Sequence, residues 1–441
     1  MANIALCIPT YQRHECVYEF LHEYSEYYQK YGMDIYYYDS SPDDKTYSIV
    51  KTFCENVSGI YYVRIPVEMH SNAKVYKIFQ QYGLKKSYDF IWVCNDAIRF
   101  SEQALAQMQA QINDSYDIVE MDHEDVEHLG LRIYENPNLY LRDCAWKLTL
   151  YGAAILNVHT ILSGIEWSAY EQKFLKREMI NFSHVSLYFN RIVEMKQFKA
   201  LHIPIESKEF KSSMYKKYPG WHNDTFFIFC ESWVNTIERL PNCYTEKKEA
   251  ILKHGIYTFF KDSSAFENLK IERIFGFTVF LRYIREWKKI CSVPVNRLLL
   301  ISLTPINVYQ NREKKKRKEK ISKCIAFIKC HSGFVIYGAG HMAHIVASYC
   351  DMRKIRYEYF CVTHLDDRKK EYMGHPVKEL AQVKEELHSK GILICMRGDY
   401  AEEVIDTLNI YGLSDYLYFD EELFGIMDSE LNRRDTRRKK V

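Results

Sequence analysis

Near its start the chain reads Ala5-Leu6-Cys7-Ile8-Pro9-Thr10-Tyr11-Gln12-Arg13, which is its most informative stretch. A second stretch of the same kind follows, Ile35-Tyr36-Tyr37-Tyr38-Asp39-Ser40-Ser41-Pro42-Asp43-Asp44. Each begins with an apolar, β-prone run and ends in polar and turn-forming residues, which predicts a strand followed by a loop. Residues 17–31 between them have the pattern of a helix. A strand, a helix and a strand in this order predict two parallel strands.

The polar residues at the ends of these two strands predict a ligand site. In parallel α/β sheets, ligands bind at the carboxyl ends of the strands. Those ends carry Thr10-Tyr11-Gln12-Arg13 and Asp39-Ser40-Ser41. No glycine-rich loop follows the first strand, so the pyrophosphate of a cofactor is not expected on the first helix. A carboxylate and hydroxyl groups suit the base and ribose of a nucleotide instead.

Composition sets the broad class of the protein. The chain has 441 residues, of which 47% are hydrophobic, so two or three domains with buried cores are expected. The net charge of +2 gives no reason to expect a nucleic-acid partner. The 13 cysteines are scattered without a C-x-x-C pair, which favours free thiols in the cytoplasm. Neither a signal peptide nor an apolar run long enough to cross a membrane is expected.

The order and spacing of these features resemble the opening of inverting glycosyltransferases of family 2. Their GT-A fold begins with an apolar strand, a Pro-Thr-Tyr-Asn-Arg-like turn, a helix and a second strand that ends in Asp. In this chain the turn is Pro9-Thr10-Tyr11-Gln12-Arg13 and the acid is Asp39. The resemblance implies a mainly parallel α/β sheet domain, with a nucleotide-sugar at Pro9, Thr10, Tyr11, Arg13, Asp39 and Ser40.

Four segments are expected along the chain. Residues 1–262 form the GT-A domain, with strands at 4–8, 34–38, 60–65, 90–93 and 118–121. Residues 263–330, in which basic and aromatic residues alternate before a basic cluster at 312–318, are expected to form a helical linker. Residues 331–425 form a small Rossmann-like module, and residues 426–441 form a charged tail that is expected to be disordered.

The stretch Cys94-Asn95-Asp96 ends an aromatic strand, at the place where the resembling family has its Asp-x-Asp motif. The resemblance implies that Asn95 and Asp96 lie at the donor diphosphate and that Asp96 binds Mn²⁺ or Mg²⁺. Such an ion stabilises the charge that the leaving nucleoside diphosphate acquires. Only one carboxylate is present here, so either Asp96 has help from another residue or the metal has a smaller role. A simple turn after a strand is the alternative.

Residues 206–222 are polar, rich in lysine and without periodicity. They resemble the mobile loop that closes over the donor in GT-A enzymes and often presents a late histidine to the metal. The resemblance implies that His222 is a metal ligand and that Lys208 and Lys211 neutralise the diphosphate. A solvated surface loop is the alternative.

Inversion needs a base that removes the proton of the acceptor hydroxyl. In the resembling family it is an acid just before a late helix, where this chain has Ser183-His184. An imidazole with a pKa of about 6.5 is able to perform that transfer. Three interpretations stay open: His184 is the base, Ser183 is only a helix cap, or the base is Glu171 or Glu178. Gly152, which precedes two alanines, resembles the segment beside the donor sugar, and tight packing is the alternative.

Two further motifs have weaker implications. Acidic and histidine residues crowd between residues 122 and 128, but their spacing fits no metal template, so a solvated loop is expected. The stretch Gly338-Ala339-Gly340-His341-Met342-Ala343 fits the dinucleotide fingerprint. The next strand lacks the acid at its end, and Asp366 and Asp367 come late. The module resembles those of bacterial polysaccharide-synthesis proteins, which implies assembly or regulation, with nucleotide binding as the alternative.

The resemblance implies an inverting, metal-dependent hexosyltransferase that uses a UDP-sugar. The expected acceptor is a glycan or a lipid-linked glycan in the synthesis of a bacterial surface polysaccharide such as a capsule. The basic, aromatic linker agrees with a cytoplasmic protein that is peripheral at the inner face of the plasma membrane, and a homo-oligomer is compatible with the sequence. The alternatives are a scaffold that has lost catalysis and a nucleotidyltransferase, although the latter needs a glycine-rich turn where this chain has Pro9-Thr10-Tyr11.

Overall fold

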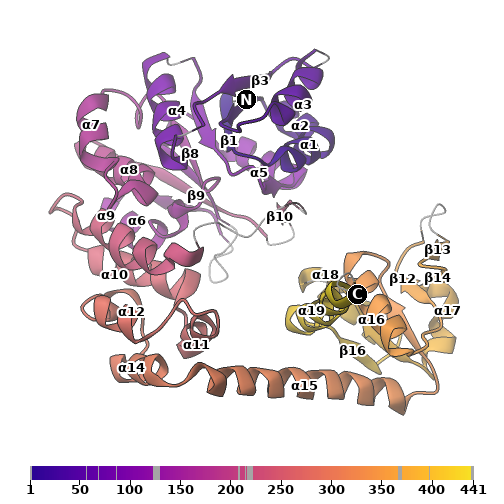
Figure 1. Ribbon diagram of the computed structural model, residues 1–441. Helices are drawn as coiled ribbons and strands as arrows, with labels where there is room; N and C mark the ends of the chain where they lie inside the picture. The colour runs from indigo at the N-terminus through magenta and orange to yellow at the C-terminus, as the bar shows by residue number, and fades with distance from the viewer. Residues whose placement is uncertain are drawn as a thin grey trace. The chain divides into compact units, whose positions relative to one another are not determined.

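The structure is a computed structural model that describes residues 2–438, apart from 56, 68, 86, 123–129, 207–208, 214, 216–221, 366–369 and 397. The chain divides into two compact units, Met1–Thr304 and Pro305–Val441. Figure 1 shows the elements of both. Among the helices that the structure describes, none is both long and apolar enough to cross a lipid bilayer.

The first unit is built on a mainly parallel sheet with the strand order β3-β2-β1-β4-β8-β6-β9-β7. Strands β1, β2, β3 and β4 run parallel to one another, as do β6 and β9. Strand β8 is antiparallel to both of its neighbours, and β7 is antiparallel to β9. This confirms the predicted α/β sheet. The strands are β1 (Ile4–Thr10), β2 (Met33–Asp39), β3 (Ile60–Arg64), β4 (Phe90–Val93), β6 (Ile118–Asp122), β7 (Arg132–Tyr134), β8 (Ala154–Asn157) and β9 (Ala200–Pro204).

Helices cover both faces of this sheet (Figure 1). Apolar side chains of β1 alternate between the two faces, and Ile4, Leu6 and Ile8 join one core with residues of α1, α2, α3 and α5. Helices α4 and α8 pack against each other on the opposite face. The helix predicted at residues 17–31 is divided at Tyr24 into two helices. The helices of this part are α1 (His14–Glu23), α2 (Ser25–Lys30), α3 (Lys45–Cys54), α4 (Ser71–Lys85), α5 (Glu102–Gln111), α6 (Pro137–Cys144), α7 (Trp167–Phe174), α8 (Ser183–Glu194), α9 (Val234–Glu238) and α10 (Lys247–His254).

The segment 263–330 is helical as expected, but it is not a separate linker. Its first half belongs to the first unit and its second half to the second unit. The reason is aromatic packing: Phe226 and Phe260 of the first unit stack against Phe266, Phe275 and Trp287. The helices concerned are α11 (Ser263–Ile271), α12 (Phe277–Arg282), α13 (Trp287–Ile290), α14 (Val295–Leu303) and α15 (Ile306–Cys330).

Four strands of the first unit, β5, β7, β8 and β10, occur where the sequence predicted none. Within the expected mobile loop, β10 (Phe210–Ser212) pairs antiparallel with β5 (Ile98–Phe100). The small-residue segment after Gly152 continues directly into β8. The ring of Phe210 packs edge-on against Phe100, with ring centroids 5.5 Å apart, so this part of the loop is fixed to the strand that follows Asp96.

The second unit has a sheet with the order β13-β14-β12-β11-β15-β16, in which all but β13 are parallel. The predicted disordered tail is instead mostly helix: α19 begins at Glu421, and Ile426 and Met427 are buried in the core beside α16. The elements are β11 (Phe334–Tyr337), α16 (His341–Arg353), β12 (Phe360–Val362), β13 (Glu371–Tyr372), β14 (His375–Glu379), α17 (Leu380–Leu387), β15 (Gly391–Ile394), α18 (Gly398–Ile410), β16 (Tyr416–Tyr418) and α19 (Glu421–Arg438).

Candidate functional site

Asp96 follows the central strand β4 and is bound by Thr10, the last residue of β1, and by Arg13 in the turn after it. The hydroxyl of Thr10 donates a 2.8 Å hydrogen bond to Oδ2, and Arg13 Nη1 lies 2.8 Å from Oδ1. Asp96 is 5% exposed. Burial raises its pKa above the ordinary value, and the Arg13 charge and the Thr10 hydrogen bond oppose that rise. Thr10 and Arg13 therefore reduce, but do not remove, the cost of keeping the buried Asp96 ionised.

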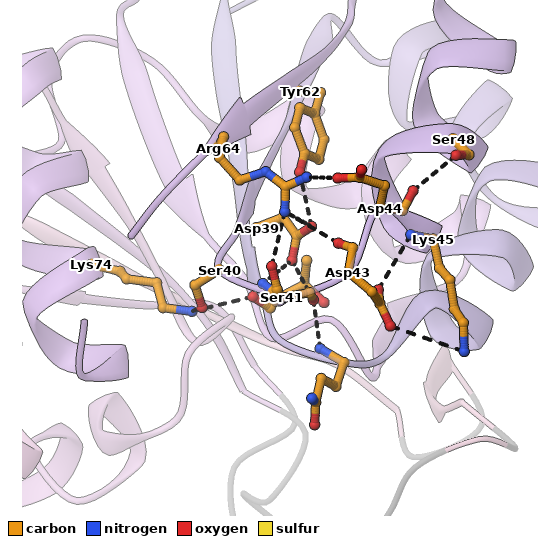
Figure 2. A network of polar contacts seen from close by, with 12 residues as sticks. Asp39, Ser40, Ser41, Asp43, Asp44, Lys45, Ser48, Tyr62, Arg64 and Lys74 are labelled. Carbon is orange, nitrogen blue, oxygen red and sulfur yellow. Dashed lines mark hydrogen bonds and ion pairs between the residues drawn. The ribbon is translucent and has the colours of Figure 1, made fainter. Parts of the chain in front are cut away.

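Asp39, at the end of β2, is fully buried and held by its neighbours (Figure 2). The backbone N–H and the hydroxyl of Ser41 donate to Oδ1 at 2.8 and 2.5 Å. The Tyr62 hydroxyl donates to Oδ2 at 3.0 Å, and Arg64 Nη1 lies 3.9 Å from the same oxygen. Arg64 also pairs with Asp44 in front of this carboxylate. These contacts fix the orientation of Asp39. Neither Tyr62 nor Arg64 was predicted from the sequence to lie at this site.

Lys74 joins the two acids, and the sequence did not single it out. It reaches in from α4, and its Nζ donates to the Thr10 carbonyl at 3.2 Å and to the Ser40 hydroxyl at 2.5 Å (Figure 2). Lys74 is buried, which lowers its pKa, while the charges of Asp39 and Asp96 raise it. Because Lys74 bonds both to Thr10, whose hydroxyl holds Asp96, and to Ser40, which follows Asp39, the two acids lie in one hydrogen-bond network.

The rim of this site is open. The Tyr11 ring is 47% exposed and lies 5.9 Å from Lys74 Nζ. Gln12 next to it has a φ of 52°, a left-handed conformation that few side chains adopt, and its N–H donates to Ser41 Oγ at 2.7 Å. The turn after β1 is therefore hydrogen-bonded to the turn after β2. The exposed Tyr11 ring belongs to the first of these turns.

Asn95 and Gly152 shape the turn that presents Asp96. The Asn95 side chain accepts a 2.8 Å hydrogen bond from the Ala97 N–H, which is an Asx turn and not a free ligand position. Gly152 has a φ of 116°, and a Cβ there would lie 3.1 Å from Cys94 Sγ. Glycine is thus required by the backbone beside Cys94. Asn95 and Gly152 therefore lie next to Asp96 and Cys94, and each stabilises the local backbone conformation.

His184, near the start of α8, is inside the first unit and packs against Tyr151. It is buried, its Nε2 is 3.1 Å from the Leu148 carbonyl, and its ring centroid is 4.7 Å from that of Tyr151. The Tyr151 hydroxyl in turn donates to Asn72 of α4. Burial lowers the pKa of His184 to about 4. Ser183 is the first residue of α8 and not its cap, because Phe182 occupies the cap position.

The remaining predicted residues are spread around the site or lie outside the described residues. Glu171 of α7 is exposed, and Glu178 pairs with Arg239 at 3.5 Å. Lys211 lies in β10 and is exposed. Lys208, the run from His123 to His128 and the side chain of His222 lie outside the described residues, although His222 begins a short 3₁₀ helix, His222–Asp224.

Comparison with known proteins gives distant likenesses. No protein-family model matches the chain, and no curated protein does. A mannosyltransferase from Pyrobaculum calidifontis solved with GDP-Man and Mn²⁺ is 13% identical, covering 68% of this chain and 79% of that one with a TM-score of 0.36. Residues 1–349 of S. aureus TarS are 10% identical, with coverages of 64% and 80% and a TM-score of 0.38. Glucosyl-3-phosphoglycerate synthase from Mycobacterium tuberculosis with Mn²⁺, UDP and phosphoglyceric acid is 9% identical, with coverages of 55% and 80% and a TM-score of 0.36.

The depressed pKa of His184 makes stability depend on pH. The folded value of about 4 lies below the ordinary 6.5, so the unfolded chain binds more protons between these values. The neutral, buried His184 therefore contributes to the free energy of unfolding fully above pH 6.5. As the pH falls toward 4, the free energy of unfolding decreases by about 3 kcal/mol. We expect H184Q to flatten this part of the stability profile in urea unfolding between pH 4 and 7.

The control for that measurement is H22Q, because His22 is exposed. It should leave the profile unchanged. A profile for H184Q that runs parallel to the wild-type profile would show that His184 is not buried in its neutral form.

In the second unit, the glycine turn after β11 has the geometry that its sequence predicts. Gly338 has a φ of 116°, and a Cβ there would lie 3.0 Å from the Cys395 carbonyl oxygen. Gly340 occupies the cap position of α16. Asp366 and Asp367 lie outside the described residues. The turn is therefore formed, and nucleotide binding by this unit stays the alternative to a role in assembly or regulation.

Proposed function

We propose that the first unit is a GT-A glycosyltransferase that transfers a hexosyl group, with inversion, from a UDP-sugar to a glycan or lipid-linked acceptor. The observation that carries the proposal is the hydrogen-bond network at the sheet edge: Asp39 ends β2, Asp96 follows β4, and Lys74 bonds to Thr10 and Ser40 between them. A nucleotide-sugar has a base at one end and a diphosphate at the other, so two acids at the ends of strands on either side of β1 suit its two ends.

Asp39 is suited to the base or ribose. A carboxylate has about four acceptor positions, and the hydrogen bonds from Ser41 and Tyr62 use three of them. One position on Oδ2 is left for an N–H or hydroxyl of the nucleoside. Asp39 has no exposed surface, so Arg64 would have to move aside. Its pairing with Asp44 is exposed and therefore weak enough to allow this.

Asp96 is suited to a divalent metal ion at the diphosphate. Thr10 and Arg13 use one acceptor position on each of its oxygens and leave the others for an ion. Mg²⁺ and similar ions are commonly held by one or two carboxylates together with substrate phosphates and water, so a single acid fits. When bound, the ion would stabilise the departing nucleoside diphosphate. Arg13 would add positive charge at the same place, and a contribution from His222, Lys208 or Lys211 remains a prediction.

The base remains a choice between His184, Glu171 and Glu178. His184 is neutral at pH 7, as a base must be, but the Tyr151 ring lies against it. Glu171 is exposed. Glu171 is open to solvent, whereas the Tyr151 ring packs against the buried His184. E171Q and H184Q should therefore differ: the true base lowers the rate of transfer without weakening donor binding.

An exposed apolar surface supports contact with a membrane that carries the acceptor. Helices α12 and α14 pack together. Six large apolar side chains on them and on the adjoining turn are 36–58% exposed: Phe277, Leu281, Ile284, Leu299, Leu300 and Leu303. Arg282, Arg285 and Lys288 are exposed beside them. Apolar residues bordered by basic ones are typical of surfaces that lie on an anionic leaflet, and this would suit synthesis of a bacterial surface polysaccharide.

The double variant L300E/L303E is expected to weaken binding to anionic vesicles at least about tenfold, because it removes two insertable side chains and adds two repelled charges. Flotation with phosphatidylglycerol-containing vesicles measures this. I410E is the matched control, since Ile410 is 81% exposed but lies in the second unit. A wild-type protein that ignores such vesicles at low salt would contradict membrane contact and leave sugar transfer untouched.

Titration calorimetry against a panel of nucleotide-sugars, with and without Mn²⁺, tests the function itself. We expect one UDP-sugar to bind more tightly with the ion and to be slowly hydrolysed to UDP and free sugar. A scaffold without catalysis would give no hydrolysis. A nucleotidyltransferase would release pyrophosphate from a nucleoside triphosphate instead. Either of these results would overturn the proposal.

A further inference from the structure

A second cluster of reactive side chains lies inside the same sheet, away from Asp96. Glu120 of β6 and His202 of β9 are partners in register, so both side chains point to the same face. Cys144, the last residue of α6, lies against them. All three are buried, with at most 1% exposed. One ligand atom from each lies within 4.8 Å of the other two.

The spacing within this cluster suits a shared ion better than a hydrogen bond. His202 Nδ1 is 3.4 Å from Glu120 Oε2, whereas N–H···O bonds are usually about 2.9 Å long. Bonds of about 2.0 Å from a tetrahedral zinc ion place two ligand atoms about 3.3 Å apart. Neither oxygen of Glu120 accepts a hydrogen bond from any residue in the described part of the chain. A fully buried carboxylate in this state calls for a cation.

The surroundings orient the imidazole as a ligand. With Nδ1 facing Glu120, the other ring nitrogen faces Asp122, where Nε2 is 3.9 Å from Oδ2. The same oxygen of Asp122 is paired with Lys147. Histidines that bind metals usually direct their second ring nitrogen toward a carboxylate, which fixes the tautomer and the ring.

We propose that Glu120, Cys144 and His202 bind one Zn²⁺ ion. Thiolate and imidazole ligands favour zinc over Mg²⁺ or Ca²⁺, and a water molecule would complete four ligands. The charges balance: Glu120, Asp122 and a Cys144 thiolate are neutralised by Lys147 and the ion. Because the cluster is buried, the ion is structural. It connects the end of α6 to β6 and β9, and it does not depend on the proposed transferase activity.

The test is the metal content of the full-length protein, purified without chelator. We expect about one zinc per chain, retained on dialysis, and less than a tenth of that in C144S and E120Q. C291S is the control, since Cys291 is buried but has no such neighbours in the metal-ligand search of the described residues. D96N should keep its zinc, which separates this site from the donor site.

Cobalt substitution can be measured on the wild-type protein, so it tests the site even if the variants fail to fold. Wild-type protein and C291S loaded with Co²⁺ should show the near-ultraviolet absorption of a thiolate ligand, and C144S should lack it. A wild-type protein that holds less than a tenth of an equivalent of zinc after exposure to the ion, and shows no such absorption with cobalt, would overturn the proposal. The contacts of His202 with Glu120 and Asp122 would then serve packing alone.

Discussion

The D96N variant should lose sugar transfer by about a thousandfold or more, because a lost metal ligand and a lost partner for Arg13 together remove several kcal/mol of transition-state stabilisation. Asparagine has the same shape and still accepts the Thr10 hydrogen bond, so the turn after β4 should persist. Mn²⁺ should no longer strengthen donor binding. Rates of transfer or hydrolysis and calorimetry with and without the ion measure both effects.

Stability separates this loss from unfolding. Because burial raises the pKa of Asp96, its ionised form is disfavoured in the folded state, and the acid costs stability at neutral pH. D96N should therefore unfold at the same urea concentration as the wild type or at a higher one. Lost activity with unchanged or improved stability is the signature of a functional residue.

The matched control for D96N is D117N. Asp117 is also a largely buried acid next to a strand of this sheet, where it accepts a 2.8 Å hydrogen bond from the Lys199 N–H. It precedes β6, at the opposite strand end from the candidate site, so D117N should keep both sugar transfer and the effect of Mn²⁺ on the donor. Metal-dependent donor affinity that survives in D96N within about twofold would place the ion elsewhere.

The sequence predicted the parts of this site that depend on local pattern. Apolar runs with polar ends predict strands and their carboxyl ends, and the order of elements predicts which strands are parallel. Thr10, Asp39 and Asp96 were placed at or after strand ends in this way, and their roles in a site remain predictions. Their proximity follows from topology, because the ends of neighbouring parallel strands meet at one edge.

The residues that were missed depend on contacts between distant segments. Lysine is rarely buried, so nothing local distinguishes Lys74 from the exposed Lys77 on the same helix. Glu120, Cys144 and His202 come from three separate segments, and His202 lies in what reads as an ordinary apolar strand. The unit boundary was misplaced for a similar reason: the aromatic residues after residue 263 pack on Phe226 and Phe260, which precede them in the chain.

Lys74 provides the second large effect. With K74M we expect the affinity for UDP to fall roughly 100-fold, or about 2.7 kcal/mol. The buried ammonium offsets the charges of Asp39 and Asp96, and without it the diphosphate would approach two acids whose charge is no longer balanced. Calorimetry with UDP alone isolates this effect from the metal. K77M, on the exposed side of α4, is the control and should bind UDP as the wild type does.

A double-mutant cycle decides how Lys74 acts. If it works by balancing Asp39, then K74M in a D39N background should cost much less than K74M alone, since the charge to be balanced has gone. Additive losses would mean that Lys74 contacts the ligand directly. Unchanged UDP affinity in K74M would mean that the link between Asp39 and Asp96 only stabilises the fold. The proposal that Asp39 and Asp96 bind the same nucleotide-sugar would then lose its support. The effect of the metal ion at Asp96 would have to be established independently of Asp39.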